Sequence, residues 1–333
     1  MALPFPFYRA RLWLGVFLSA SLMALSGCGS LPHSQELTVS PQQAELTQVP
    51  FYAQTKYQCG PAALATVLQH RDQNVLPDDL VSRVYTPQKQ GSLQVDMIGA
   101  ARQQGLVPYP LEPNMQALLT EVAQGNPVLV MQNLRFGWWP LWHYAVVVGY
   151  DLSENEVVLR SGETKRRVTT LGTFERTWQR ADYWALVVVE PDRIPATANH
   201  QAWLKTAFDL EQTGQKAAAL TAYQTGWQTW PQSAQLGMAL ANLHYQQGQY
   251  DSSSQTFAAL SRRHGQQAMV WNNWAYALKA QGCKHEAHQA AQCARQLAPD
   301  DPDIQSTSQE MQTSARPEPD CPRVQCPTVR SEN

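Results

Sequence analysis

Residues 54–68 read QTKYQCGPAALATVL and join a cysteine to a run of helix-forming residues. Gly60 and Pro61 follow Cys59, and the next residues are rich in Ala and Leu, which favour a helix. Proline is favoured in the first turn of a helix, where its missing N–H has no partner in any case. Cys59 is therefore predicted at the start of a helix, either as a buried structural thiol or as a nucleophile that faces a cleft.

The length and charge of the chain limit its class. It has 333 residues and a formal net charge of −2. The length suits two domains of ordinary size, and the charge does not favour a nucleic-acid-binding protein, which needs a basic surface. The sequence has no CxxC pair, HExxH motif or Gly-rich phosphate loop, so we expect no metal and no cofactor.

The N-terminus has the pattern of an export signal. Arg9 and Arg11 precede the apolar run 12–25, which is shorter than the ~20 residues that a spanning helix needs. The run ends in LSGC, which resembles a bacterial lipobox, and the resemblance implies a lipid on Cys28. We expect a signal peptide over 1–27, a tether over 28–45 and attachment to the periplasmic face of the outer membrane. An ordinary secretory signal with an incidental cysteine is the alternative.

Five cysteines remain after Cys28. Export would place them in an oxidising compartment. Four of them can form two local bridges, because two lie in one helical segment and two in a Pro-rich tail, although sequence cannot fix the pairing; they are Cys283, Cys293, Cys321 and Cys326. Cys59 has no evident partner, so it is either reactive or a small buried hydrophobe.

Residues 46–192 read as one domain in which helices precede strands. Three segments have helical patterns, and four short, β-branched runs bounded by Gly, Asp, Asn or Pro read as strands. The helices are expected over 62–68, 97–104 and 115–124, and the strands over 127–134, 144–150, 157–159 and 183–189. This order favours an α+β fold over a wound βαβ sheet.

His143 is the leading candidate for a base that acts on Cys59. It heads the predicted strand that contains HYAVVVGYD, whereas the other seven histidines lie in the tether, in a polar segment or near the C-terminal helices. The N-terminus of a helix stabilises a thiolate, and an imidazolium beside it would form an ion pair and protonate a leaving amine. A buried structural histidine is the alternative.

CGPAAL with a preceding glutamine, followed about 80 residues later by HYAVVVGYD, resembles the double-glycine leader peptidases, the bacteriocin-processing branch of the papain-like cysteine peptidases. The resemblance covers roughly residues 50–190 and implies a papain-like α+β domain. It assigns Cys59 as the nucleophile, His143 as the general base and acid, and Gln54 as an oxyanion donor beside the N–H of Cys59.

The third catalytic residue departs from this family. The family has an aspartate on the strand after the histidine, and Ser161 falls at that place. A serine hydroxyl can accept the imidazole N–H but offers no charge to an imidazolium, which implies slow catalysis or none. Asp151 and Glu163 are the acidic alternatives, although Asp151 fits a turn cap in DLSEN better.

The segment RFGWWPLWH places four aromatic residues directly before His143: Phe136, Trp138, Trp139 and Trp142. Gly137 and Pro140 indicate a loop. The aromatic side chains either line a substrate groove or pack against the sheet, and the sequence favours neither reading.

The C-terminal part is periodic. After a linker over 191–198, Gly214, Gly248 and Gly282 recur every 34 residues between amphipathic stretches. This pattern resembles the tetratricopeptide repeat and implies an all-α domain of three repeats over 200–300 that binds a protein partner. The Pro-rich residues 301–333 are expected to be disordered.

These patterns together predict a lipid-anchored cysteine peptidase that acts on a peptide or protein. An inactive scaffold that binds peptides or proteins is the main alternative, and Ser161 favours it. Amide-bond transfer or hydrolysis of a peptidoglycan peptide with the same nucleophile is a third, since papain-like folds host those reactions too.

Overall fold

The computed structural model describes residues 37–54 and 58–328. The predicted signal peptide and Cys28 lie outside this range. None of the helices in the described part of the chain combines the length and apolar character that a membrane crossing requires.

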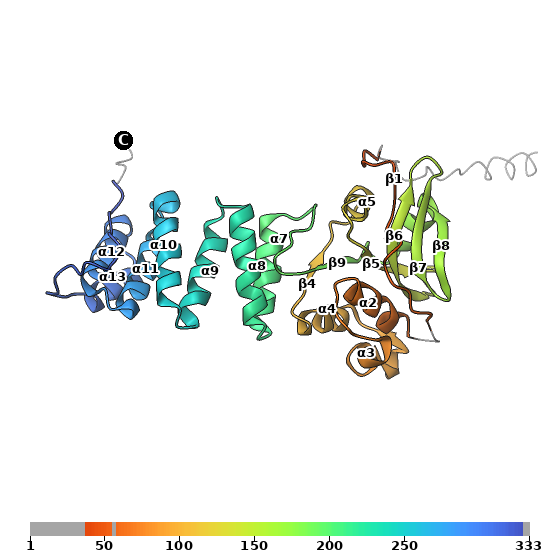
Figure 1. The fold of residues 1–333 in the computed structure, drawn as a ribbon, viewed down its shortest axis with the longest axis horizontal. Coiled ribbons are helices and arrows are strands. Elements are labelled where there is room, and N and C mark those ends of the chain that lie inside the picture. Colours follow the sequence, from red (N-terminus) through yellow and green to blue (C-terminus); the bar gives the residue numbers. More distant parts are fainter. Residues whose placement is uncertain (1–36, 55–57, 329–333) are drawn as a thin grey trace, which may run out of the picture. The chain divides into compact units, whose positions relative to one another are not determined.

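The first domain contains an antiparallel sheet and several helices (Figure 1). Its strands are β1 (Gln43–Glu45), β4 (Val107–Pro110), β5 (Val128–Asn133), β6 (Trp142–Asp151), β7 (Glu156–Ser161), β8 (Thr164–Thr170) and β9 (Ala185–Val189), with a small pair β2 (Tyr85–Thr86) and β3 (Gly91–Ser92). Its helices are α2 (Cys59–Gln69), α3 (Pro77–Val84), α4 (Gln94–Gln103), α5 (Met115–Ala123) and α6 (Leu171–Gln179), with the short turn η1 (Pro87–Lys89).

The sheet has the strand order β4-β9-β5-β6-β7-β8, and β1 also pairs with β6. All these pairings are antiparallel. The predicted strands and the three predicted helices are present, whereas the helices α3 and α6 and the strands β1, β4 and β8 were not predicted. An α+β domain is therefore confirmed.

Helix α2 packs on one face of the sheet. Leu64 and Leu68 of the helix share a fully buried core with Tyr144, Val146 and Val148 of β6. These β6 residues are two apart, so they lie on one face of the strand. This core packs α2 against β6.

A buried polar network holds the linker to the first domain. Glu121 of α5 is fully buried, and one of its carboxylate oxygens accepts hydrogen bonds from Thr197 N (2.7 Å) and Thr197 Oγ1 (2.6 Å). The other oxygen accepts from Asn126 Nδ2 at 2.6 Å, and Arg71 donates to Asn126 Oδ1 at 2.7 Å. A buried carboxylate needs such partners, so the linker completes the folding of α5.

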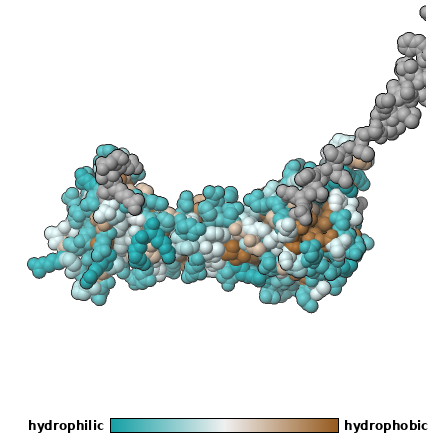
Figure 2. Space-filling model, turned by 90° about the horizontal axis from the view of Figure 1, so that it is seen from above, coloured by the Kyte–Doolittle hydropathy of each residue, from teal (hydrophilic) through white to brown (hydrophobic). Residues whose placement is uncertain are grey.

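The C-terminal domain is helical, as predicted. Its helices are α7 (His200–Gln212), α8 (Lys216–Thr229), α9 (Ala234–Gln246), α10 (Tyr250–His264), α11 (Ala268–Gln281), α12 (Lys284–Leu297) and α13 (Pro302–Glu310). Gly214, Gly248 and Gly282 follow α7, α9 and α11 with φ angles of 83°, 73° and 98°. Glycine adopts this left-handed backbone without steric cost, which explains its recurrence every 34 residues. Hydrophilic residues predominate on the face of the repeats in Figure 2.

The expectation of disorder over 301–333 is wrong for the described residues of that segment. Residues 302–310 form α13, and Ile304 and Met311 are buried against α11 and α12. His285 Nδ1 lies 3.1 Å from Ala315 O, and Gln266 Nε2 donates to Thr328 O at 3.2 Å. The polar composition was misleading because a few buried apolar side chains and two disulfides are enough to hold this segment.

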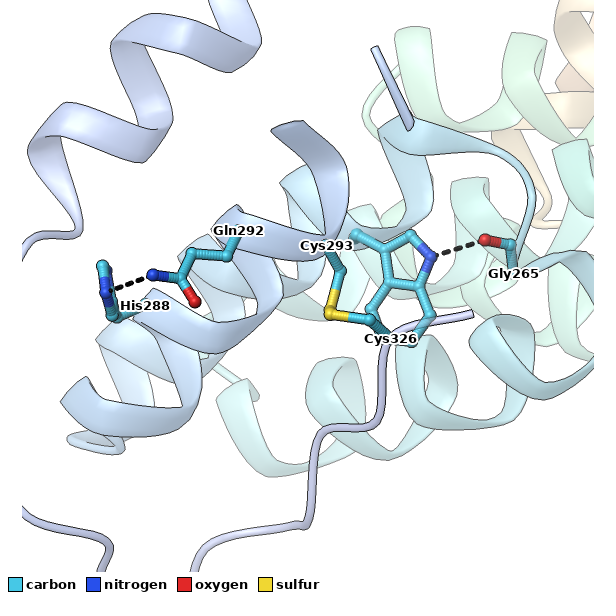
Figure 3. Close-up of a disulfide and its surroundings, with 6 residues drawn as sticks. Gly265, His288, Gln292, Cys293 and Cys326 are labelled. Carbon is cyan, nitrogen blue, oxygen red and sulfur yellow. Dashed lines mark hydrogen bonds between the residues drawn. A yellow bond between two sulfur atoms is a disulfide. The ribbon is translucent and has the colours of Figure 1, made fainter. Parts of the chain in front are cut away.

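The disulfides join the tail to α12 and do not form local bridges. Cys283 pairs with Cys321 and Cys293 with Cys326, at Cα–Cα distances of 5.7 and 5.0 Å. Figure 3 shows the second bridge between α12 and the tail. A bridge between Cys283 and Cys293 is excluded because ten helical residues separate their Cα atoms by about 15 Å, far beyond the ~7 Å limit of a disulfide.

Candidate active site

Cys59 is the first residue of α2. Its side chain is half-buried and packs at the edge of the core between α2 and the sheet. Gly60 comes next and is fully packed, since a Cβ at this position would lie 2.5 Å from Ser92 Cβ and would also overlap Ser92 Oγ. The close approach of β3 thus requires glycine beside Cys59.

The backbone of Tyr144 connects Cys59 and Gln54 to β6. The backbone N–H of Tyr144 acts on the Cys59 thiol and lowers its pKa, and the Tyr144 carbonyl accepts from Gln54 Nε2 at 3.3 Å. His143 is the residue directly before Tyr144. Cys59 and Gln54 therefore meet the backbone of β6 directly after His143, at the first turn of α2.

The register of the sheet explains why this peptide group is available. The pairing of β6 with β7 begins only at Val146, which is opposite Arg160. On the other side Met131 is opposite Tyr144 and donates its N–H to Trp184. In an antiparallel pair this leaves the N–H and C=O of Tyr144 pointing away from β5. The two Tyr144 groups point to the side of β6 on which β7 no longer pairs with it. Cys59 and Gln54 lie on that side.

His143 and Ser161 are hydrogen-bonded. His143 Nε2 lies 2.9 Å from Ser161 Oγ, and Ser161 is buried at the end of β7. The structure thus places a serine hydroxyl where the family resemblance implies a carboxylate. This bond fixes the plane of the imidazole and leaves its other nitrogen, Nδ1, free of this contact.

The electrostatics favour a neutral thiol and a neutral imidazole. Burial raises the pKa of the Cys59 thiol, although the N–H groups of Tyr144, Gly60 and Cys59 oppose this shift. Burial also lowers the pKa of His143 to about 4, and the positive charge of Arg167 acts in the same direction. The expectation that the helix N-terminus lowers the thiol pKa is therefore wrong in net effect, because desolvation exceeds the stabilisation by N–H groups.

Asp151 does not belong to this site. It ends β6, eight residues after His143, which corresponds to about 25 Å along an extended strand. Its Oδ1 accepts hydrogen bonds from Ser153 N, Ser153 Oγ and Glu154 N at 2.9, 2.6 and 3.1 Å. Asp151 is a turn cap, and the proposal that it replaces the missing aspartate is wrong. Glu163 is exposed in the turn after β7.

Arg160 positions the segment that leads to Gln54, a role that was not predicted from the sequence. Its buried guanidinium donates to Val49 O at 3.2 Å and to Lys165 O at 2.8 Å. Gln54 N donates to Gly162 O at 3.0 Å. The segment before α2 is thus attached to the end of β7, where Ser161 lies. An arginine in an apolar strand, as in VVLRS, is the signal that could have indicated a buried anchor.

One group of side chains in the described residues could be considered for a metal. Ligand atoms of Cys283, Glu286 and Cys321 lie within 4.8 Å of one another. Cys283 and Cys321 are joined in a disulfide, whereas metals bind the thiolate form of cysteine. The group lies in the repeats and takes no part in the candidate active site.

Comparisons with known proteins agree with this division of the chain. Residues 46–186 match the model of the Peptidase_C39 like family, and residues 210–282 match a tetratricopeptide repeat model. No curated protein matches the chain.

Solved structures resemble each part separately. A C39-like peptidase from Bacillus anthracis has 16% identity and a TM-score of 0.39, covering 44% of this chain and 97% of that chain. The peptidase domain of Streptococcus ComA, a bifunctional ABC transporter of a quorum-sensing pathway, has 20% identity and a TM-score of 0.33, covering 42% and 96%. The first TPR of Spaghetti (RPAP3), bound to an HSP90 peptide, has 12% identity and a TM-score of 0.32, covering 34% and 89%. The chain is an α+β domain similar to C39 peptidases, followed by a helical domain of tetratricopeptide-like repeats.

Proposed function

We propose that this protein is a cysteine peptidase in which Cys59 attacks a peptide carbonyl and His143 transfers the proton. The observation that supports this most is the hydrogen bond from the Gln54 amide to Tyr144 O, directly after His143, beside a Cys59 thiol whose pKa the Tyr144 N–H lowers. A structural thiol would not require a glutamine amide at the same peptide group.

The proposed reaction begins from a neutral pair. As the sulfur attacks the carbonyl carbon, the thiol proton passes to His143, and Ser161 holds the other imidazole nitrogen. Gln54 Nε2 and the N–H of Cys59 donate to the oxyanion. The imidazolium then protonates the leaving amine, and water hydrolyses the acyl-enzyme with His143 as the base. The Cys59 thiol and the His143 imidazole are both neutral at rest, and position 161 carries a hydroxyl instead of a carboxylate. Both features predict a slow enzyme.

A non-catalytic scaffold is the second candidate. The pKa shifts of Cys59 and His143 away from an ion pair favour it. In that case the first domain would hold a peptide without cleaving it. The repeats would recruit a protein partner in either case.

The deciding experiment combines peptide turnover with trapping of the acyl-enzyme. The purified chain is incubated with a peptide mixture, and mass spectrometry records new termini and any acyl adduct on Cys59. We expect both signals in the wild type and neither in Cys59→Ala, with a strongly reduced rate in His143→Ala. Peptides that bind intact and equally well to all three proteins would establish the scaffold.

The location of the protein is part of this proposal. LSGC suggests that Cys28 is lipidated and that the domains face the periplasm at the outer membrane. Metabolic labelling with a radioactive fatty acid tests this directly. We expect label in the wild type and none in Cys28→Ser, and an unlabelled wild type would exclude the anchor.

A further inference from the structure

The loop between β5 and β6 exposes an unusual amount of apolar surface. We call residues 134–142, LRFGWWPLW, the aromatic loop, and its last residue, Trp142, is also the first residue of β6. Six of its side chains are exposed: Leu134 (38%), Phe136 (60%), Trp138 (81%), Trp139 (60%), Leu141 (43%) and Trp142 (51%). They do not pack against the sheet, so the core alternative from the sequence is wrong. Contiguous apolar patches on a protein surface commonly mark an interaction site.

The aromatic loop is held rigidly although it is exposed. Asn133 is buried beneath it, and its Oδ1 accepts from Arg135 N at 3.1 Å and from Leu141 N at 2.9 Å. Asn133 Nδ2 donates to Phe136 O at 3.3 Å, and Trp139 N donates to the same carbonyl at 3.2 Å. Exposed aromatic side chains on a fixed backbone lose little conformational entropy when they bind.

The side chains also support one another. The rings of Phe136 and Trp138 stack at a centroid distance of 5.7 Å with an angle of 8° between their planes. The rings of Trp138 and Trp139 lie 6.2 Å apart. The exposed surface is therefore a joined aromatic platform and not a set of separate side chains.

The high exposure of Trp138 distinguishes between possible partners. A side chain that lines a peptide groove is partly covered by the walls of that groove, whereas 81% of Trp138 is open to solvent. A protruding aromatic side chain suits a partner that can close around it. The interfacial region of a lipid bilayer does so, and tryptophan is enriched there because one end of its ring is apolar and the other polar.

The charges at the aromatic loop are cationic. The Arg135 guanidinium lies 5.2 Å from the centre of the Trp139 ring. Arg180, at the end of α6, donates to Arg135 O at 2.9 Å and remains exposed. The loop itself contains no Asp or Glu. Arginine beside interfacial aromatic residues is suited to the phosphate groups of anionic lipids.

We infer that the aromatic loop is a membrane-docking element that inserts its aromatic side chains into the interface of an anionic bilayer. This binding is peripheral. It requires neither peptide hydrolysis nor a lipid on Cys28, so it can be tested apart from the proposed function.

The test uses the full chain with Cys28→Ser, so that no lipid anchor contributes. Partitioning is measured by sedimentation with vesicles of phosphatidylethanolamine and phosphatidylglycerol, and with phosphatidylcholine vesicles for comparison. We expect the added substitutions Trp138→Ser and Trp139→Ser to weaken partitioning about tenfold. Arg180→Ala should weaken it about fivefold on the anionic vesicles only.

Two matched controls accompany these variants. Phe208→Ser removes an aromatic side chain that is 49% exposed in the repeats, and Arg262→Ala removes an exposed charge in α10; both should leave partitioning unchanged. Hydrogen exchange gives a local readout: vesicles should slow exchange in residues 134–142 but not in the turn at 152–155. Circular dichroism confirms that each variant is folded.

Specific results would overturn the inference. Equal partitioning of the reference and the double tryptophan variant would do so, and so would unchanged exchange in the aromatic loop. Loss of peptide turnover in the tryptophan variant with normal vesicle binding would assign the loop to substrate recognition instead.

Discussion

His143 Nε2 lies 2.9 Å from Ser161 Oγ, in a pair that fixes the imidazole without a neighbouring negative charge. A carboxylate at this place would favour the imidazolium, whereas the hydroxyl only orients the ring. Burial and Arg167 oppose the charged form as well. The candidate site thus orients the imidazole of His143 but does not stabilise a permanent thiolate–imidazolium ion pair.

Restoring a carboxylate should increase the reactivity of Cys59. A neighbouring negative charge raises a histidine pKa by about 1–3 units, so Ser161→Asp should speed alkylation of Cys59 by iodoacetamide about tenfold or more near pH 6. Ser161→Ala should slow it about threefold to tenfold, because one hydrogen bond is lost. Mass spectrometry of the alkylated peptide across pH gives both profiles. Identical profiles for Ser161→Asp and wild type would exclude an electrostatic role at position 161.

Acid should destabilise the fold through His143. Its pKa is lowered from 6.5 to about 4 in the folded protein, so the unfolded chain binds more protons between these values. Stability should therefore fall as the pH drops from 6.5 towards 4, by up to about 3 kcal/mol from this residue. Urea unfolding at several pH values measures the loss. His143→Gln cannot titrate and should show a shallower dependence, and equal slopes would contradict the assignment.

Gln54 should affect the rate of catalysis. Loss of an oxyanion donor typically costs ~2.7–4 kcal/mol of transition-state stabilisation, so Gln54→Ala should lower kcat by about a hundredfold or more. Peptide turnover at saturating substrate measures this. Gln58→Ala is the neighbouring control, because Gln58 directly precedes α2. A larger loss for Gln58→Ala would show that the wrong glutamine had been assigned.

The glycine beside Cys59 should be essential for local packing. A Cβ at position 60 would overlap the side chain of Ser92, so Gly60→Ala should destabilise the protein by about 1–3 kcal/mol. Thermal unfolding followed by circular dichroism measures the change. Adding Ser92→Gly removes the overlap and should recover most of the loss. A double variant no more stable than Gly60→Ala would show that the strain lies in the helix backbone.

The sequence indicated the parts of the site that depend on local chemistry. Gly60 and Pro61 place Cys59 at a helix start because their backbone properties act over a few residues. Ser161 could be identified as the partner of His143 because it occupies the place of a family aspartate one strand later. The 34-residue glycine period was likewise readable, since the turns after α7, α9 and α11 have the left-handed backbone that glycine favours.

What the sequence did not indicate depends on register and burial. The role of Tyr144 comes from the point at which β7 stops pairing with β6, which no residue in either strand marks. The direction of the Cys59 pKa depends on how deeply the thiol is buried, and the position in the helix alone suggested the opposite. The disulfide pairing was left open, and the local bridges considered from the sequence do not form because closeness in sequence is not closeness in space along α12.

The pairing of the tail with α12 has a consequence for biosynthesis. Cys283 and Cys293 leave the ribosome 38 and 33 residues before their partners. Once α12 has formed, it keeps Cys283 and Cys293 too far apart to form a disulfide with each other. Their bridges can therefore form only after Cys321 and Cys326 have been synthesised. A premature stop codon before residue 321 would therefore remove both covalent links at once and leave two orphan thiols in the last repeat.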